Sequence, residues 1–438
     1  MRVRVTGCVL LVLAAAACGG GEGGGLSGVP STTSTTSTSG ATSTTGTPGT
    51  ALTPSTTKAT GATATASTTE IPGTPGTSSP GSGSSSGGGG LEAVVPTTTE
   101  DIVTSPTVRT VLGDTEASVD GTTTTTTEEP WDGLTMPLTG EPAPDGLPER
   151  PALVVKVGNN DGRSLPQVGL EVADIVYEVM VENYVTRFIA VYHSELPEAV
   201  RPVRSARSSD IDLLANLDRP IFAYWGSNAG VAEEVGEAER LGLLQARSTT
   251  GRGQEHFHRD DSRKAPYNGV LDPASVVNSL DGPTPPPGPI ISYGPVPASA
   301  VRTFGVRWTT ANRDIAFVWD TGSEQWIRYQ DGVPHLDANG VPLAADNVLK
   351  LTVGYRKSDA DQKSPQLLST GSGDGWLFRD GTVTGIVWSR QFIADGWTIL
   401  DDDTGQRLHL DQGSTWVLMA RLGEGEILDT RESRALTG

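Results

Sequence analysis

Cysteine is almost absent from this chain. Of its 438 residues only Cys8 and Cys18 carry a thiol, and both lie near the start. Two cysteines cannot build a disulfide framework or a cysteine-based zinc site. Outside the low-complexity region before residue 131, the chain also lacks a Gly-x-Ser-x-Gly elbow, a phosphate-binding P-loop and a His-Glu-x-x-His motif. No cofactor is therefore expected, and no standard catalytic motif identifies an enzyme.

Aromatic residues are missing from the first part of the chain. The sequence holds 9 Trp, 8 Tyr and 7 Phe, and the first of them is Trp131. Residues 19–130 are mainly Gly, Ser, Thr, Pro and Ala, as in STTSTTSTSGATSTTGTPGT at 31–50. Such a segment cannot bury enough apolar surface to offset the backbone entropy lost on ordering, about 1–2 kcal/mol per residue. We expect residues 18–130 to be a long disordered stalk that serves as a spacer or tether.

The N-terminus carries the pattern of a secretory signal. Arg2 and Arg4 precede an apolar run, Val9–Ala17, which is shorter than the roughly 20 residues of a membrane-spanning helix. The run ends in Ala-Ala-Ala-Cys, which resembles the lipobox of bacterial lipoproteins, where the signal is removed before a cysteine that is then acylated. A rival lipobox ends at Cys8, but cleavage there would leave almost no apolar segment for export. A third alternative is an ordinary signal cleaved elsewhere.

We predict a lipoprotein signal peptide at 1–17 and a lipidated Cys18. The lipid would attach the protein to the extracytoplasmic face of the cell membrane. The formal net charge is −20, from 52 acidic and 32 basic side chains. This acidity argues against nucleic acid as a partner, because phosphate binding requires a basic face.

The chain after residue 130 changes character at a proline-rich stretch, DGPTPPPGPI at 281–290. Before it, strand-like and helix-like segments alternate, which favours an α/β layer. After it, short β-type runs are separated by turn signals such as Asp-Gly, which favour antiparallel hairpins. We predict a mixed α/β domain at 131–280, a linker at 281–289 and a smaller antiparallel β-rich domain at 290–430.

One segment of the first domain is ambiguous. GLEVADIVYEVMVE at 169–182 places Val172, Ile175, Val176 and Val179 at helical spacing, although Ile175–Val181 could also alternate as a strand. The helical interpretation would set three carboxylates on one face, because they recur every four residues. These are Asp174, Glu178 and Glu182.

Several blocks resemble the signature segments of the YerB-type lipoproteins, a bacterial family of unknown function. They are PLTGEP at 137–142, GLEVADIVYEVMVENYVTRFIAVY at 169–192, RPVRSAR at 201–207, HRDDSRKAPYNGVL at 258–271, GSGDGWLFRDGTVTGIVW at 371–388 and LDQGSTWVLM at 410–419. The match runs from about 137 to 420 and departs at Tyr267, where the family pattern leads us to expect histidine. The resemblance implies an exported or membrane-attached protein of two domains without an established activity.

RPVRSAR concentrates positive charge in an acidic chain. Its arginines could converge with others nearby on a phosphate or carboxylate, since guanidinium groups bind such anions in bidentate fashion. The alternative is that they pair internally with Asp174, Glu178 and Glu182 and only fix the fold. The candidate set for either role is Arg187, Arg201, Arg204, Arg207, Arg259 and Arg263.

A second candidate site lies in QEHFHRDDSRK at 254–264, where we expect His256 and His258 on one strand face with Glu255, Asp260 and Asp261 nearby. Two imidazoles with a carboxylate can hold a divalent metal, but His-x-His alone is a weak pattern. The alternative interpretation is a surface loop in which Arg259, Asp260 and Arg263 lock the chain.

Three hypotheses of function remain open on the sequence. The first is a non-enzymatic envelope module that binds a cell-wall polymer or an envelope protein. The second is an enzyme or carrier that acts on an anionic wall polymer or lipid-linked phosphate through Arg187, Arg204 and Arg207, with Asp174 or Glu178 as a general base or metal ligand. The third is a solute-binding lipoprotein, which would need two similar α/β lobes.

Overall fold

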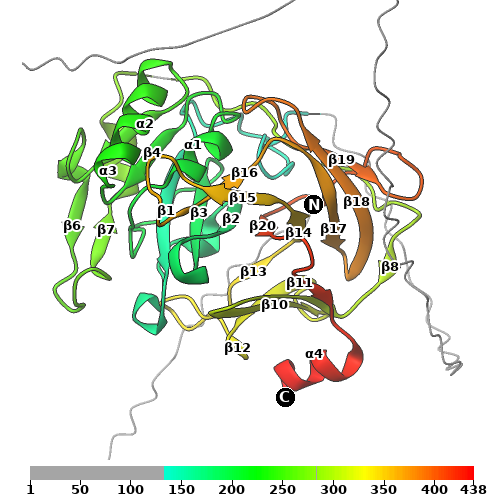
Figure 1. The fold of residues 1–438 in the computed structure, drawn as a ribbon. Helices are drawn as coiled ribbons and strands as arrows, with labels where there is room; N and C mark the ends of the chain where they lie inside the picture. The colour runs from blue at the N-terminus through cyan, green and yellow to red at the C-terminus, as the bar shows by residue number, and fades with distance from the viewer. Residues whose placement is uncertain (1–132, 283) are drawn as a thin grey trace, which may run out of the picture. The chain divides into compact units, whose positions relative to one another are not determined.

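The computed structural model describes residues 133–282 and 284–438 (Figure 1). The predicted signal peptide, Cys18 and the whole of the predicted stalk lie outside the described residues. The described residues all belong to one compact unit. Among them, no helix is long and apolar enough to cross a membrane.

An 11-stranded mixed sheet forms the centre of this unit, in the order β19-β18-β17-β14-β20-β2-β3-β1-β4-β5, with β8 paired to β18. Its first-half strands are β1 (Leu153–Asn159), β2 (Ile175–Met180), β3 (Thr186–Tyr192), β4 (Ile221–Tyr224) and β5 (Gln245–Ser248). Its second-half strands are β8 (Val301–Arg302), β14 (Asn347–Thr352), β17 (Gly371–Arg379), β18 (Thr382–Arg390), β19 (Thr398–Asp401) and β20 (Thr415–Ala420).

The two halves of the sequence meet inside this sheet. β20 lies parallel to β2, with Ile175 opposite Thr415 and Glu178 opposite Leu418. The end of the proline-rich stretch also enters the core, because the backbone N–H of Trp397 donates to the carbonyl of Ile290 at 2.7 Å. The strands on either side of the predicted linker therefore share one continuous hydrogen-bonded ladder.

A second, six-stranded sheet packs against one face of the central sheet. Its main order is β12-β11-β10-β9-β21, with β13 paired to β11. Aromatic and aliphatic side chains from both sheets fill the space between them, including Phe188, Trp308, Phe317, Trp326 and Trp416. The strands are β9 (Gly305–Thr310), β10 (Arg313–Asp320), β11 (Gln325–Gln330), β12 (Val333–Pro334), β13 (Ala344–Ala345) and β21 (Glu426–Ile427). The C-terminal helix α4 (Thr430–Thr437) follows β21, and Leu436 packs on the other side of this sheet.

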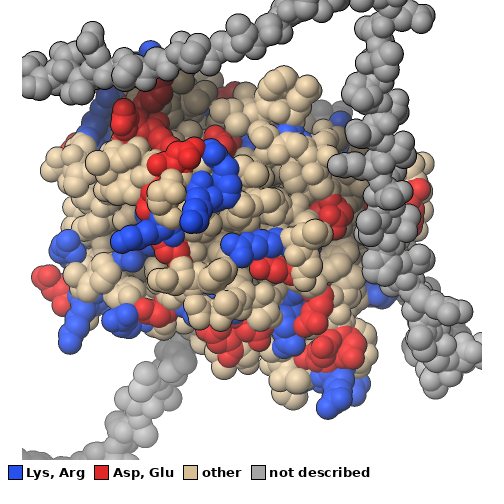
Figure 2. Space-filling view, viewed as in Figure 1, with Lys and Arg blue, Asp and Glu red and all other residues tan. Residues whose placement is uncertain are grey.

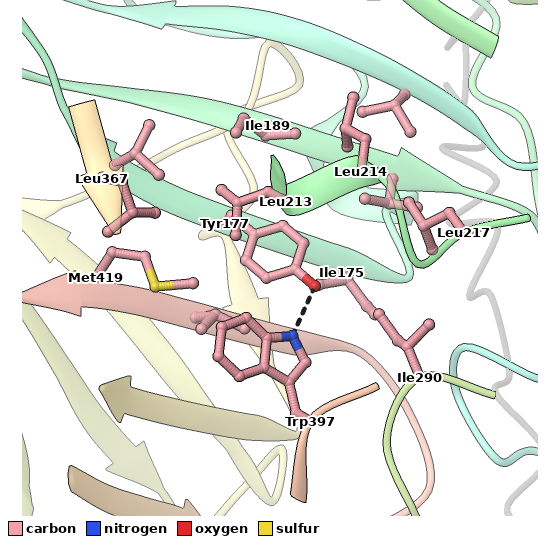
Figure 3. Close-up of a cluster of buried hydrophobic side chains, with 14 of the residues drawn as sticks. Ile175, Tyr177, Ile189, Leu213, Leu214, Leu217, Ile290, Leu367, Trp397 and Met419 are labelled. Carbon is pink, nitrogen blue, oxygen red and sulfur yellow. Dashed lines mark hydrogen bonds between the residues drawn. The ribbon is translucent and has the colours of Figure 1, made fainter. Parts of the chain in front are cut away.

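Helices α1 (Ser208–Leu214) and α2 (Ala229–Arg240) contribute to the core on the opposite face of the central sheet. In α2 the buried residues Val231, Val235 and Ala238 follow helical spacing, and the Asn228 side chain caps the first turn by accepting from the Val231 N–H. Figure 3 shows how residues of both halves fill this core, where the Trp397 indole donates to the Tyr177 hydroxyl at 3.4 Å.

The remaining elements are short. Helix α3 (Pro273–Asn278) follows the hairpin of β6 (Phe257–Arg259) and β7 (Gly269–Leu271), and β15 (Gly354–Lys357) pairs with β16 (Pro365–Leu368). Single 3-10 turns occur at Gly162–Ser164, Leu170–Val172, Glu182–Tyr184 and Gln254–His256.

The predicted fold class is confirmed: a mixed α/β part precedes an antiparallel β-rich part. The helical interpretation of 169–182 is wrong, however, because Ile175–Met180 is strand β2 and all six of its residues are buried. A strand buried on both faces carries apolar residues without strict alternation, so its spacing can imitate that of a helix. Asp174, Glu178 and Glu182 consequently do not share a helical face.

The backbone conformation and the close packing at Gly140 explain why the PLTGEP block has a glycine at this position. Its φ angle is +68°, and an added Cβ would lie 2.3 Å from Cγ of the Tyr293 ring. We expect Gly140→Ala to lower the free energy of unfolding by about 2–3 kcal/mol, because both the backbone and the ring must shift. Urea denaturation would measure this loss, and Gly146→Ala is the control, since Gly146 also has a positive φ but has open space around it. Equal losses in both variants would contradict the steric argument.

Candidate functional site

The RPVRSAR segment lies beside β1 of the central sheet. Its backbone is fixed by hydrogen bonds from the Arg204 N–H to the Lys156 carbonyl at 2.8 Å and from the Gly158 N–H to the Pro202 carbonyl at 2.9 Å. Gly158 also leaves room for the Arg204 stem, because a Cβ there would lie 2.6 Å from Arg204 Cγ. The segment then leads directly into α1.

Arg187 and Arg207 meet at one carboxylate. Glu182 accepts a hydrogen bond from Nε of Arg207 at 2.5 Å, and its other oxygen lies 3.7 Å from an Nη atom of Arg187. Burial alone would raise the pKa of Glu182, but Arg207 and Arg187 outweigh burial and lower this pKa to about 2. Burial and the neighbouring Arg207 lower the pKa of Arg187 to about 9. The sequence-predicted internal pairing therefore exists for Glu182.

Lys156 extends the cluster into the core. Its ammonium lies 2.6 Å from Asp210, and both side chains are fully buried. Burial lowers the pKa of Lys156 to about 8, although Asp210 opposes the shift, and Arg187 and Arg207 add to it. Asp210 also accepts from the Arg207 backbone N–H at 2.8 Å, which closes the first turn of α1.

Arg204 lies at the outer side of the same cluster. One of its Nη atoms donates to the Pro266 carbonyl at 2.9 Å, and its guanidinium lies 5.5 Å from the centre of the Tyr267 ring. Tyr267, where the family pattern suggested histidine, in turn donates to Asp161 at 2.7 Å. The Nε atoms of Arg187 and Arg204 are buried without a hydrogen-bond partner among the described residues.

Charge is not balanced within this group, which we call the arginine cluster. Its cations are Lys156, Arg187, Arg204 and Arg207, and its carboxylates are Glu182 and Asp210. The cations lower one another's pKa, as Arg207 and Arg204 do for Arg187. The cluster thus keeps an excess of positive charge inside an acidic protein.

The other three predicted arginines lie apart from the cluster and hold the 257–268 region in place. Arg201 pairs with Asp260. Arg259 donates to the Asn268 side chain at 2.8 Å and stacks on Trp225, and Arg263 donates to the Leu165 carbonyl at 2.8 Å. Their contacts agree with the loop-locking alternative.

The two histidines are not brought together as ligands. His256 is buried, and its Nδ1 lies 2.8 Å from the Ser275 hydroxyl, whereas His258 is exposed on β6. Their expected alternation on one strand is wrong, since His256 belongs to a 3-10 turn that precedes the strand. Among the described residues, no group of three or more His, Cys, Asp or Glu side chains is arranged to hold a metal.

Asp174 and Glu178, the candidate catalytic carboxylates, are both buried. Both form their hydrogen bonds and ion pairs with residues outside the arginine cluster. Asp174 accepts from the backbone N–H groups of His193 and Ser194, and burial raises its pKa to about 6. Glu178 pairs with Arg328 at 2.8 Å, and neither side chain is exposed. The expected pairing of these two carboxylates with the RPVRSAR arginines is therefore wrong.

The Glu178–Arg328 pair is the centre of a buried polar network between the two sheets. Glu178 also accepts from Thr186 at 2.7 Å and from the Trp416 indole at 3.1 Å. Arg328 contacts His335, whose second ring nitrogen lies 2.7 Å from the Gln167 side-chain oxygen. Since that oxygen can only accept, His335 carries its proton on Nε2 and receives the Arg328 N–H on Nδ1. Burial and Arg328 lower the pKa of His335, so it stays neutral.

Arg328 and His335 were missed at the sequence level. Local patterns indicate only a strand for QWIRYQ at 325–330, on which Trp326, Arg328 and Gln330 share one face. The position of Arg328 between a tryptophan and a glutamine on one strand face was the sequence signal for a buried charge. No residue near it in the sequence identified its partner.

Comparisons with known proteins agree with this architecture. Residues 138–284 match the N-terminal domain, and residues 304–417 the C-terminal domain, of the family described as Protein of unknown function (DUF3048). The Bacillus subtilis protein called "Putative lipoprotein YerB" is 28% identical over 295 residues, which are 65% of this chain and 85% of that protein. The crystal structure of YerB from Bacillus subtilis aligns with a TM-score of 0.59 at 26% identity and covers 68% of this chain and 100% of that one.

Proposed function

Because this chain belongs to the DUF3048 family of proteins of unknown function, as its sequence blocks predicted, we propose that it is a lipid-anchored binding module of the cell envelope. Cys18 carries the lipid and attaches the protein to the extracytoplasmic face of the cell membrane. The stalk at 18–130 extends the folded body away from that membrane. The name of the Bacillus subtilis relative supports the lipoprotein assignment.

The observation that carries the binding role is the way in which charged side chains are held. Glu182, Asp210 and Glu178 each have a basic partner within the described residues. A carboxylate that must act as a base needs access to substrate, but Asp174 and Glu178 are enclosed. These contacts favour a rigid body that binds a partner through its surface, and they argue against a catalytic centre. The positive excess of the arginine cluster favours an anionic partner.

The anchor is tested by replacing each cysteine in the full chain. We expect Cys18→Ala to abolish incorporation of a labelled fatty acid and to shift the protein out of the lipoprotein fraction of the membrane. Cys8→Ala is the matched control, because it removes the other thiol and leaves the Ala-Ala-Ala-Cys sequence intact. Loss of label in Cys8→Ala, with label retained in Cys18→Ala, would contradict the assignment.

The binding role is tested with envelopes isolated from the cells that produce the protein. We expect the full chain to sediment with envelopes from which lipid has been extracted, and the envelope polymers to keep their length during incubation. Release of shortened polymer by the wild type, and not by a heat-denatured sample, would favour the alternative in which the protein is an enzyme. Failure to sediment would contradict a wall partner.

A further inference from the structure

A basic pocket lies next to the arginine cluster. It has a volume of about 330 Å³ and is lined by residues 181–184, 355–357, 362–365 and Arg421. Its basic lining residues are Arg356, Lys357, Lys363 and Arg421, and the acidic side chain among the lining residues is Glu182. Figure 2 shows Lys and Arg side chains gathered near the middle of the molecule's face, over the region of β15 and β16 in Figure 1.

Glu182 does not cancel the charge of this pocket. Its carboxylate is already shared by Arg207 and Arg187 and accepts from the Ser364 hydroxyl at 2.6 Å. Arg356 pairs with Asp359 at 3.0 Å, but both side chains are exposed, and such a pair is screened by water. Among the residues that line the pocket, four basic side chains therefore stand against one carboxylate that is already paired, on a protein whose net charge is −20.

Two tyrosines give the pocket an aromatic wall. The Arg421 guanidinium lies 5.2 Å from the centre of the Tyr184 ring and 5.5 Å from that of Tyr355. The Tyr355 hydroxyl is fixed by donation to the Met419 carbonyl at 2.8 Å, whereas the Tyr184 side chain is half exposed. Arg421 is thereby positioned by stacking, and within the described residues its guanidinium N–H groups make no hydrogen bond, so they can be offered to a ligand.

The loop that presents Tyr184 is held in an unfavourable backbone conformation. Asn183 and Tyr184 have φ angles of +59° and +56°, a left-handed region that residues other than glycine seldom occupy. The second sheet stabilises this conformation, because Thr310 donates to the Tyr184 carbonyl at 2.6 Å and Asn312 donates to the Asn183 carbonyl at 2.5 Å. Strain of this kind persists where surrounding contacts impose it, and it gathers at ligand-binding loops.

We propose that this pocket binds a phosphodiester-bearing polyol or glycan polymer. The Lys and Arg side chains suit phosphate oxygens, and Tyr184 suits the face of a sugar or polyol unit. Gln362, whose amide N–H donates to the Ser358 carbonyl at 2.9 Å, supplies its side-chain oxygen as an acceptor for a ligand hydroxyl. This proposal rests on the proposed function, since it names the ligand class and the site of the binding module.

The test uses the full chain in a neutral detergent and oligomers of glycerol phosphate as the probe. The Lys357→Ala/Lys363→Ala double variant removes two exposed positive charges from the pocket, and Arg219→Ala/Lys264→Ala removes two exposed positive charges elsewhere. We expect the pocket variant to bind the oligomers at least ten-fold more weakly than the wild type, as measured by calorimetry at low salt. The control variant should stay within about two-fold of the wild type.

Three results would overturn the proposal. One is an equal loss of affinity in both double variants, which would indicate a diffuse charge effect. Another is equally strong binding of uncharged dextran, which would show that recognition does not depend on phosphate. The third is an absence of oligomer binding together with binding of phosphatidylglycerol micelles that the pocket variant loses, which would assign the pocket to a lipid headgroup. In each case an acylated Cys18 and sedimentation with lipid-free envelopes would leave the proposed function standing.

Discussion

Arg328→Met is expected to lower the free energy of unfolding by about 3–5 kcal/mol, the usual cost of breaking a buried ion pair by removing one partner. Glu178 would remain fully buried in a protein interior without its cation. The Thr186 hydroxyl and the Trp416 indole would still donate to it, but neither carries charge. Urea denaturation followed by tryptophan fluorescence would measure the change, which corresponds to a fall of roughly 10 °C in Tm.

Two further variants separate loss of the pair from loss of a side chain. In Arg328→Met/Glu178→Gln the buried charge is removed as well, so we expect the double variant to regain part of the stability that the single variant loses. Arg431→Met is the matched control, because Arg431 lies exposed on α4. A loss below 1 kcal/mol in Arg328→Met, or a double variant less stable than either single one, would contradict the ion-pair argument.

The same network explains why the two halves of the chain depend on each other. Glu178 and Thr186 come from the central sheet, whereas Arg328 and His335 come from the second sheet and the segment after it. Parallel pairing of β2 with β20 adds a continuous ladder across the halves. Either half alone would leave a charged side chain facing an open sheet. We therefore expect the halves to unfold in one transition.

Much of the architecture could be predicted from local patterns. The α2 segment shows helical spacing, and its buried residues follow that spacing in the structure. The Asp380-Gly381 turn was a hairpin signal, and both residues have positive φ angles between β17 and β18. These features depend on neighbours in sequence, so the sequence is sufficient to indicate them.

Segment 169–182 shows where local patterns fail. β2 lies between β3 and β20 and is buried on both faces, so its apolar residues do not alternate. Glu178 is the acidic residue inside β2, and the arginines of RPVRSAR were its nearest candidate partners in the sequence. Its true partner, Arg328, is 150 residues away. The many arginines close together in the sequence made the convergence of Arg187 and Arg207 predictable. Their common partner Glu182 was one of three candidate carboxylates. Selecting it required knowledge of how strand β2 runs through the sheet.

Glu182→Gln is the second variant with a large expected effect, and its effect depends on pH. Glu182 has a pKa of about 2 in the folded protein, against an ordinary value of 4.5. A carboxylate with a depressed pKa stabilises the fold above its ordinary pKa and loses that contribution as the pH falls through the folded pKa. Removing it should cost on the order of 2 kcal/mol at pH 7, after allowance for solvent screening of this partly exposed group.

The measurement is the difference in unfolding free energy between wild type and Glu182→Gln from pH 7 to pH 2.5. We expect the difference to be constant above about pH 5 and to shrink as the pH falls from about 4.5 toward 2. Asp174, whose raised pKa acts in the opposite direction between about pH 4 and 6, is present in both proteins and cancels in this difference. Glu237→Gln is the control, because Glu237 forms an exposed pair with Arg240 on α2 and should change stability little at any pH. A difference that does not vary with pH would mean that Glu182 acts through packing, and that the positive charge of Arg187 and Arg207 is neutralised by something other than this carboxylate.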